Sequence, residues 1–380
     1  MAISSYWLEE PAQPFAAPVA SGHVDVAVIG GGVTGCSCAL TLARHGVSVR
    51  LYEARTVAGG ASGRNGGFAL RGSAEPYDVA RERLGRETAY DLWVLTQQTL
   101  DRLADLAGDA FRRVGSLRLA ADRAEREALE REWAALREDG LTVEWVDELA
   151  APLDALFVGA ILHPLDGALH PARWVRRLAS LAAAAGAELV EGVRVEIENV
   201  DADAVIVAVD GATSAVLPEL ARVLWPVRGQ VLVTEPLPER LFPRPHYARG
   251  GYDYWQQLPD ERLLVGGRRD TSAEAENTAD DGTTTSAIQA QLESLAVALI
   301  DRLPAVTHRW AGVWGTTPDL LPLVGRVPGR DRVWIAGGYA GHGNVLGLAC
   351  GDAVARAVLG EPAPEIALFD PARFFPSAGC

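Results

Sequence analysis

The stretch Gly-Gly-Gly-Val-Thr-Gly at residues 30–35 decides the fold. It follows an apolar run at 24–29, which is typical of a buried parallel strand. A helix is expected over 33–44, and Gly46 ends it. A second strand is expected over 47–52. The first fifty residues therefore predict a βαβ unit with a glycine-rich turn between its first strand and its helix.

Each glycine of this turn has a role if the unit binds a dinucleotide. Gly30 permits the tight turn, Gly32 lets the backbone approach a pyrophosphate, and Gly35 lets the helix pack closely on the strand. The pyrophosphate would lie at the positive end of the helix that begins with Val33 and Thr34. Glu53 would accept hydrogen bonds from the ribose hydroxyls. The alternative is a tight turn with no ligand.

A second glycine-rich run, GGASGRNGG at 59–67, indicates which dinucleotide is bound. A plain NAD-binding unit would continue here into a crossover helix, whereas backbone amides and one arginine suit the ribityl and pyrophosphate of FAD. The alternative is a flexible surface loop. The FAD interpretation assigns cofactor contacts to Ala54, Arg55, Gly60, Ala61, Ser62, Arg64, Asn65, Gly66 and Gly67.

The rest of the chain alternates between two kinds of pattern. Helices are expected over 78–107, 122–139, 171–185 and from about 286 to 302, and buried strands over 187–195, 204–209 and 333–336. Shorter strands are expected over 116–119, 231–234, 254–258 and 263–266, with an acidic loop over 270–285. The sequence therefore predicts a nucleotide-binding sheet with a second unit inserted into it.

Composition and charge exclude several classes of function. The 380 residues are 48% hydrophobic and 22% charged, as in folded globular proteins. A formal net charge of −15 disfavours binding to nucleic acid or an anionic membrane surface. No apolar run reaches the roughly 18 residues of a membrane span, and the first residues lack a signal-peptide pattern. We expect a cytoplasmic protein that is a monomer or a small homo-oligomer.

The reactive residue types narrow the chemistry further. All 35 basic residues are arginine, so Schiff-base chemistry, a P-loop lysine and a lysine that activates dioxygen are excluded. Cys36, Cys38, Cys350 and Cys380 form neither a disulfide framework nor a zinc pattern, and we interpret them as reduced thiols. The seven histidines show no metal-binding spacing, so no metal is expected.

Six segments spread over nearly the whole chain carry a family resemblance. They are SGRNGG at 62–67, LHPARWVRRLA at 169–179, ADAVIVAVDGATS at 202–214, RGQVLVTE at 228–235, TPDLLPLVGR at 317–326 and GGYAGHGN at 337–344. In this order they resemble the D-amino acid oxidase superfamily of FAD enzymes, which includes glycine oxidase and sarcosine oxidase. The SYW start and the SGRNGG loop look most like the gamma-glutamylputrescine oxidase type.

The resemblance implies an α/β fold of two domains. One is an FAD-binding, Rossmann-like domain of the glutathione-reductase type at 1–75, 150–225 and 318–380. The other is a substrate domain on a mixed, largely antiparallel sheet at 76–149 and 226–317. Carried over by position, Val195 would hold the adenine and Gly211 would lie near the dinucleotide. The loop with Gly338, Tyr339, Gly341, His342, Gly343 and Asn344 would face the flavin's N1 and O2.

The implied activity is oxidation of an amine C–N bond by hydride transfer to flavin N5, giving an imine that hydrolyses to a carbonyl. Residues that attach FAD covalently in some relatives are absent, so noncovalent FAD is expected. Trp314 stands where glycine-oxidase-like members have an arginine for the substrate carboxylate. This favours a small-molecule amine whose carboxylate, if present, is remote, unless Arg249, Arg268 or another arginine substitutes.

The other candidate residues at the reacting end are Tyr252, Tyr254, Trp255 and His342, with His246 as a second nearby histidine. Each also has a plain structural interpretation, and Trp314 could be core packing. The acceptor is expected to be O2. Alternatives are a glycine, sarcosine or D-amino acid oxidase, a dehydrogenase with another acceptor, and a flavoprotein without catalysis. An aromatic hydroxylase is disfavoured because its Gly-Asp pair is missing after the strand at 333–336.

Overall fold

The glycine-rich turn joins strand β1 (Val24–Ile29) to helix α1 (Val33–Arg44), as predicted. The computed structural model describes residues 5–15 and 22–375. In it β1 pairs in parallel with its neighbours on both sides. The sheet has the order β16-β17-β10-β1-β2-β9, and its other strands are β2 (Val49–Glu53), β9 (Glu188–Glu191), β10 (Ala202–Val207), β16 (Leu323–Arg326) and β17 (Val333–Gly337).

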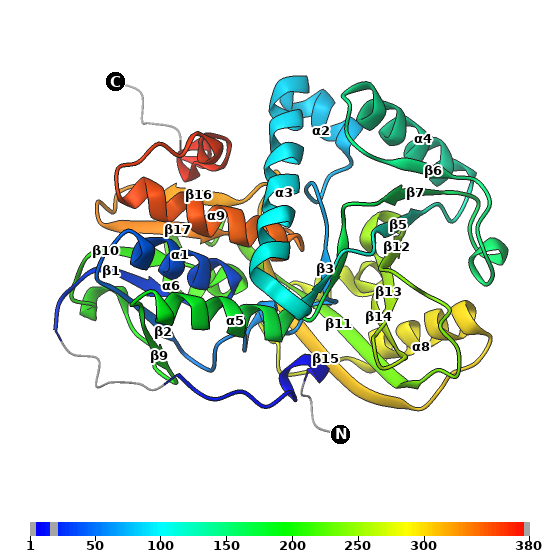
Figure 1. Ribbon diagram of the computed structural model, residues 1–380, viewed down its shortest axis with the longest axis horizontal. Coiled ribbons are helices and arrows are strands. Elements are labelled where there is room, and N and C mark those ends of the chain that lie inside the picture. Colours follow the sequence, from blue (N-terminus) through cyan, green and yellow to red (C-terminus); the bar gives the residue numbers. More distant parts are fainter. Residues whose placement is uncertain (1–4, 16–21, 376–380) are drawn as a thin grey trace.

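A second sheet of eight strands forms the other lobe (Figure 1). Its order is β15-β11-β14-β13-β12-β5-β7-β6, and every pair is antiparallel except β5 with β12. The strands are β5 (Ser116–Leu119), β6 (Glu144–Val146), β7 (Ala160–His163), β11 (Trp225–Pro236), β12 (His246–Ala248), β13 (Asp253–Gln257), β14 (Arg262–Gly267) and β15 (Val306–Thr316). The mixed, largely antiparallel second sheet is confirmed.

Some sequence predictions differ from the structure in detail. The strand expected over 187–195 ends at Glu191, because Gly192 takes a left-handed φ of 73° and the chain turns toward β2. The segment 150–225 was assigned to the nucleotide-binding domain, yet β7 within it pairs with β5 and β6 of the second sheet. The boundary between the two units therefore runs through this segment.

Helices cover the first sheet and cap the second. They are α2 (Tyr77–Leu84), α3 (Arg86–Ala107), α4 (Arg123–Glu138), α5 (Pro171–Ala184), α6 (Thr213–Val216), α7 (Ala273–Glu276), α8 (Ser286–Ile300) and α9 (Gly343–Val358). The single helix expected over 78–107 is divided at Gly85, whose φ is 87°. A small third sheet of β3 (Phe68–Ala69), β8 (Gly167–Leu169) and β4 (Phe111–Arg112) joins the lobes.

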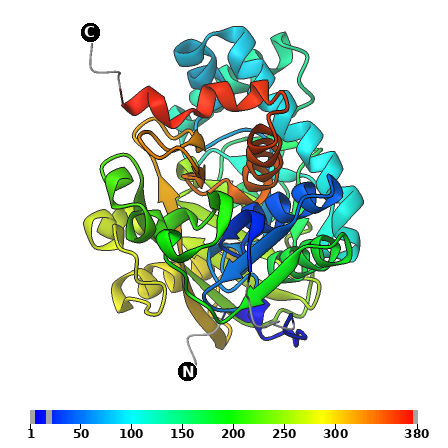
Figure 2. The ribbon, with the colours of Figure 1, turned by 90° about the vertical axis from the view of Figure 1, so that its left-hand side faces the viewer.

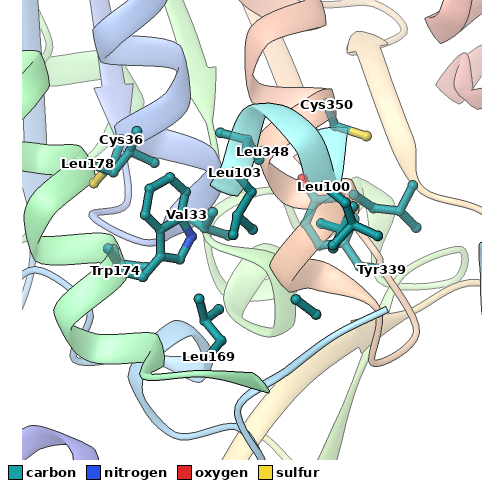
Figure 3. Close-up of a cluster of buried hydrophobic side chains, with 14 of the residues drawn as sticks. Val33, Cys36, Leu100, Leu103, Leu169, Trp174, Leu178, Tyr339, Leu348 and Cys350 are labelled. Carbon is teal, nitrogen blue, oxygen red and sulfur yellow. The ribbon is translucent and has the colours of Figure 1, made fainter. Parts of the chain in front are cut away.

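The main core lies where α1, α3, α5 and α9 meet, and the turned view shows the blue α1 beside the orange-red α9 (Figure 2). Val33 and Cys36 of α1, Trp174 and Leu178 of α5, Leu100 and Leu103 of α3, and Leu348 and Cys350 of α9 fill it (Figure 3). A Cβ on Gly351 would lie 2.4 Å from the Thr34 carbonyl, so α9 approaches α1 more closely than a larger residue allows. This packing holds the middle of α9 against the start of α1.

Candidate functional site

One cavity of about 1250 Å³ lies between the two sheets. Its wall includes Ile29, Glu53 and Ala208 at the carboxyl ends of the first sheet, and Val231 and Tyr254 on the face of the second. Ligands of open α/β sheets bind at that edge. The candidate dinucleotide site and the candidate substrate face are therefore parts of one continuous space.

The glycine-rich turn shapes the dinucleotide end. Gly30 has a φ of 114°, and a Cβ there would lie 2.4 Å from the Ala208 carbonyl, so no other residue fits. Glu53 accepts hydrogen bonds of 2.7 Å from the backbone N–H groups of Gly31 and Arg55. Its carboxylate is thereby held on the cavity wall, where the ribose is expected.

The second glycine-rich run is fixed to both lobes. Ser62 Oγ accepts a 3.0 Å hydrogen bond from the backbone N–H of Val33 at the start of α1. Arg64 donates to the carbonyls of Gly59 and Asp281, both at 3.0 Å. Trp310 donates from Nε1 to the Arg64 carbonyl at 2.8 Å. These contacts favour a built binding loop over the alternative of a flexible surface loop.

Asp210 is a site residue that the sequence reasoning missed. Its two carboxylate oxygens accept hydrogen bonds from the backbone N–H groups of Gly338 at 2.8 Å and Gly315 at 3.0 Å. It thereby joins the end of β10 to β15 and to the loop after β17. Burial raises the pKa of Asp210, and the backbone donors oppose that shift. The signal available was an acid directly after a buried strand, within VAVDGA at 207–212.

The loop at 338–344 turns sharply before α9 begins. Gly338, Ala340 and Gly341 all have positive φ, at 84°, 49° and 91°. His342 precedes the helix, lines the cavity, and has a buried Nδ1 with no hydrogen-bond partner among the described residues. Desolvation lowers its pKa to about 4, so it is neutral at pH 7. The helix N-terminus is thus open to the cavity, as a site for developing negative charge requires.

Aromatic rings lie flat on the second sheet because glycines stand beneath them. A Cβ on Gly266 would lie 2.3 Å from the Tyr254 ring, and one on Gly229 would lie 2.5 Å from the Trp314 ring. Tyr252, Tyr254, Trp314 and His342 all line the cavity. Burial raises the pKa of Tyr254 to about 12. This face offers ring surfaces to a bound molecule.

Trp255 does not belong to this face, and our expectation that it faces the cavity is wrong. Successive strand residues point to opposite sides of a sheet, so Trp255 lies on the other side from Tyr254. It is fully buried there and stacks on His246, with ring centroids 5.4 Å apart. His246 is therefore a packing partner of Trp255, away from the cavity.

Most of the predicted cofactor residues lie on the cavity wall. These are Gly30, Gly32, Val33, Thr34, Glu53, Ala54, Arg55, Gly60, Ala61, Ser62, Arg64, Asn65, Gly66, Val195, Gly211, Tyr339, Gly341, His342, Gly343 and Asn344. Gly35, Gly67 and Gly338 do not line it. A Cβ on Gly35 would lie 1.8 Å from the Gly30 carbonyl, and one on Gly67 would lie 2.5 Å from the Leu169 carbonyl, so these two allow close backbone packing.

The arginines considered as carboxylate ligands are engaged elsewhere. Arg249 and Arg268 both pair with Asp253, at 3.2 and 2.8 Å, and neither lines the cavity. Their neighbour Arg269 does line it, with its guanidinium 4.5 Å from the Tyr252 ring and 5.6 Å from the Trp314 ring. Within residues 5–15 and 22–375 no carboxylate pairs with Arg269. Sequence spacing alone did not distinguish it from Arg268.

A second group that the sequence reasoning missed lies at the opposite end of the cavity. It contains Arg71, Arg118, Glu132, His163 and Tyr247, from the segment after β3, from β5, α4 and β7, and from β12. Arg118 Nη1 donates to both oxygens of Glu132, at 2.5 and 2.7 Å. A charged residue inside the apolar strand SLRLA was the available signal.

Other candidate chemistry is sparse in the part of the chain that the structure describes. Cys36, Cys38 and Cys350 are buried and free, and Cys380 lies outside the described residues. Ligand atoms of His23, Asp25 and Asp203 lie within 4.8 Å of one another, but all three residues are exposed. No described helix combines the length and the apolar character that crossing a membrane would need.

Known proteins resemble this chain over most of its length. The family described as FAD dependent oxidoreductase matches residues 25–357. A probable oxidoreductase OrdL of Rhizobium meliloti is 30% identical over 90% of this chain and 84% of its own length. The gamma-glutamylputrescine oxidoreductase of Escherichia coli is 29% identical, over 89% of this chain and 84% of its own. The crystal structure of glycine oxidase from Geobacillus kaustophilus has a similar fold, with a TM-score of 0.76 and 24% sequence identity. The match covers 92% of this chain and 98% of that chain.

Proposed function

Because the chain belongs to the family of FAD-dependent oxidoreductases, we propose that it oxidises the C–N bond of an amine whose carboxylate, if present, is remote from the oxidised carbon. The product is an imine, which water hydrolyses to a carbonyl compound and an amine or ammonia. The observation that carries the proposal is the single cavity in which the glycine-rich groove meets the face of Tyr254 and Trp314.

The groove fits FAD in shape and in chemistry. The backbone at Gly30 and Gly32 is closely approached by its neighbours. A Cβ on Gly30 would lie 2.4 Å from the Ala208 carbonyl, and one on Gly32 would lie 2.9 Å from Ser62 Oγ. Glu53 would accept from the ribose hydroxyls, and the open N-termini of α1 and α9 would face the pyrophosphate and the flavin. When bound, the flavin accepts two electrons as a hydride from the carbon that carries the nitrogen.

The chain's own residues orient the amine and exclude water. Trp314 and Tyr254 present ring faces that attract a positive or weakly hydrated amine, a contact worth about 0.5–2 kcal/mol. The same aromatic surroundings favour the neutral amine, because desolvation disfavours its charged form. Tyr254 and His342 stay neutral there, so neither opposes loss of the amine's proton. A neutral amine has the lone pair that the forming C=N bond needs.

A second candidate, oxidation of small amino acids, is favoured by Arg269. Its guanidinium lies against Tyr252 and Trp314 and has no described carboxylate partner, so it could receive an α-carboxylate. A planar guanidinium binds such a group through two parallel hydrogen bonds. Arg269→Met would then abolish reduction by amino acids and leave reduction by simple amines intact.

The experiment is an anaerobic titration of the flavin-loaded protein with primary amines, N-methyl amines and amino acids. The loss of flavin absorbance measures the reduction of the flavin. We expect bleaching by amines and little by glycine, sarcosine or D-amino acids. The reverse pattern would overturn the amine assignment and support the Arg269 candidate. A protein that no compound bleaches would contradict both.

The electron acceptor is tested on the same preparation. We expect O2 to accept the electrons, although the chain has no lysine to supply a positive charge beside the flavin. Oxygen-driven turnover comparable to dye-driven turnover would support the oxidase. Oxygen consumption far below dye reduction would reassign the protein as a dehydrogenase.

A further inference from the structure

We propose that the end of the cavity beside Arg118 binds a carboxylate at the far end of the amine substrate, so that the substrate is an ω-amino carboxylate. This rests on the proposed function, because Tyr254 and Trp314 mark the reacting end. The structural basis is a row of side chains on one face of the second sheet, together with the free guanidinium donors of Arg118 at its end.

The row follows directly from the strand register. Tyr254 of β13 lies opposite Gly266 of β14 on one side and Tyr247 of β12 on the other, and Tyr247 lies opposite Arg118 of β5. Residues directly opposite in a sheet share a face. Tyr254, Tyr247 and Arg118 all line the cavity. Two strand spacings separate Tyr254 from Arg118, which is about 10 Å.

Arg118 is held in place with part of its guanidinium free. Only Nη1 is hydrogen-bonded to a described residue, and its acceptor is the carboxylate of Glu132. Glu132 also accepts from the backbone N–H of Tyr77 at 3.1 Å, which anchors the pair. The Arg118 side chain is 16% exposed, and the residue lines the cavity. Nε and Nη2 therefore remain as donors, which suits a planar carboxylate.

A second arginine, Arg71, lies at the same end of the cavity and makes no ion pair with a described carboxylate. Arg71, only 7% exposed, donates from its guanidinium to Gln97 Oε1 and the Thr142 carbonyl, and lies 3.5 Å from His163 Nδ1. All three partners are neutral, since burial holds the pKa of His163 well below its usual range.

The carboxylates nearby do not contact the free donors of Arg118. Glu132 pairs with Arg118 through Nη1, and Glu75 pairs with Arg83. Asp166 accepts from the backbone N–H of Arg71 and from Ser116 Oγ, balances part of the charge of Arg71, and does not line the cavity. A substrate carboxylate at this end would therefore accept hydrogen bonds from Nε and Nη2 of Arg118.

Between the two ends the wall is apolar enough for a methylene chain. Phe68 and Leu70 line the cavity, and the Phe68 and Tyr254 rings pack edge to face at 5.7 Å. The Tyr247 ring lies 5.9 Å from the Arg118 guanidinium. A linker of methylene groups would contact these rings without a polar group to satisfy.

The test compares ω-amino carboxylates from 4-aminobutyrate to 8-aminooctanoate with alkylamines and diamines of matching length. In the flavin-loaded wild-type protein, we expect the KM of the best amino carboxylate to be about 10- to 100-fold below that of the alkylamine of matching length. This ratio corresponds to one charge-assisted hydrogen bond. The double variant Arg118→Met, Glu132→Met removes both charges together, so no buried charge is left alone. It should abolish that difference while alkylamine oxidation persists.

The control is Arg123→Met, Glu127→Met, which removes an exposed pair whose side chains are 93% and 55% exposed. It should retain the full preference. If the buried double variant fails to fold, Arg118→Gln alone is measured instead. Binding of hexanoate, followed through the flavin absorbance, tests the subsite without turnover and should weaken about 10-fold or more in the Arg118 variants.

The outcomes separate the two proposals. Equal KM values for amino carboxylates and alkylamines, or unchanged hexanoate binding in the variants, would overturn the carboxylate subsite while amine oxidation stands. Diamines as the best substrates would also overturn it, and would point to Glu132 as the recognition group. Flavin reduction by none of the amines, with hexanoate binding still dependent on Arg118, would contradict the proposed function and leave the subsite supported.

Discussion

The side-chain amides of Asn65 and Asn344 exchange two hydrogen bonds of 3.1 Å, although 279 positions separate them in the chain. Asn344 also donates to the Phe68 carbonyl at 2.8 Å, and Asn65 accepts from the backbone N–H of Gly67. The pair therefore ties the second glycine-rich run to the first turn of α9. Both residues line the cavity, so this connection sets the width of the groove between the loop and the helix.

Asn344→Ala should weaken FAD binding, because the loop at 60–67 loses its attachment to α9. The loss of three partly buried hydrogen bonds should also lower the free energy of unfolding by roughly 1–3 kcal/mol. Isothermal titration of the apoprotein with FAD, with thermal melts of both forms, measures the two effects. Ser294→Ala, which removes an exposed hydrogen bond to the Ala290 carbonyl away from the cavity, is the control. Wild-type FAD affinity in Asn344→Ala would show that the connection does not position the cofactor.

Glu53→Arg should also weaken FAD binding. The carboxylate is held by the N–H groups of Gly31 and Arg55, and an arginine there offers only donors to the ribose hydroxyls and leaves those two N–H groups unpaired. We expect lower flavin occupancy after purification and a faster loss of flavin on dilution. Glu9→Arg, at an exposed position, controls for the change in net charge. Unchanged occupancy in Glu53→Arg would mean that the ribose is held elsewhere.

The flavin should leave the protein on acid precipitation. The sequence positions that carry a covalent link in similar enzymes have no suitable side chain here, and the described cysteines are buried in the core around α1 and α9. We expect all the yellow colour in the supernatant. Colour that stays in the washed pellet would contradict noncovalent binding.

The glycine-rich turn and the first two strands could be predicted because their signals are local. The turn needs a glycine with a positive φ, such as Gly30, and the strand before it needs an apolar run. Both requirements are met within a few residues, so they can be recognised in the sequence. Helices α1 and α4 agree with their expected ranges to within a residue, although α1 is buried on all sides and only α4 has distinct buried and exposed faces. Burial within one element is visible from its own residues.

The contacts between elements could not be predicted in this way. Alternate residues of β13 face the cavity, and the pairing of β13 with β12 and β14 decides whether Tyr254 or Trp255 does so. Two adjacent aromatic residues do not show in the sequence which of them faces inward. The row from Tyr254 to Arg118 joins strands that lie far apart in sequence, so its members could not be grouped beforehand. Asp210 stands out in sequence only as an acid after a buried strand, and its backbone N–H partners on two distant segments could not be predicted from that.

The rate of anaerobic flavin reduction should rise with pH, and its midpoint should follow the pKa of the amine. The amine must be neutral to form the C=N bond, and free alkylamines have a pKa near 10.4, like a lysine side chain. An aromatic, poorly hydrated site lowers that value.

Two protein groups beside the reacting end stay unchanged over the same range. The pKa of Tyr254 is raised to about 12 by burial, so its hydroxyl remains protonated below that pH. The pKa of His342 is lowered to about 4 by desolvation, so its ring remains neutral above that pH. Between about pH 6 and 9 neither changes charge, so neither produces an inflection in that range.

Stopped-flow reduction with a series of amines of different pKa distinguishes these sources. We expect the midpoint to shift with the amine, and His342→Asn and Tyr254→Phe to alter the rate without moving the midpoint. A midpoint that is the same for every amine, and that moves in either variant, would assign the titration to the protein. In that case a protein base, rather than desolvation by the aromatic face of Tyr254 and Trp314, would remove the amine's proton.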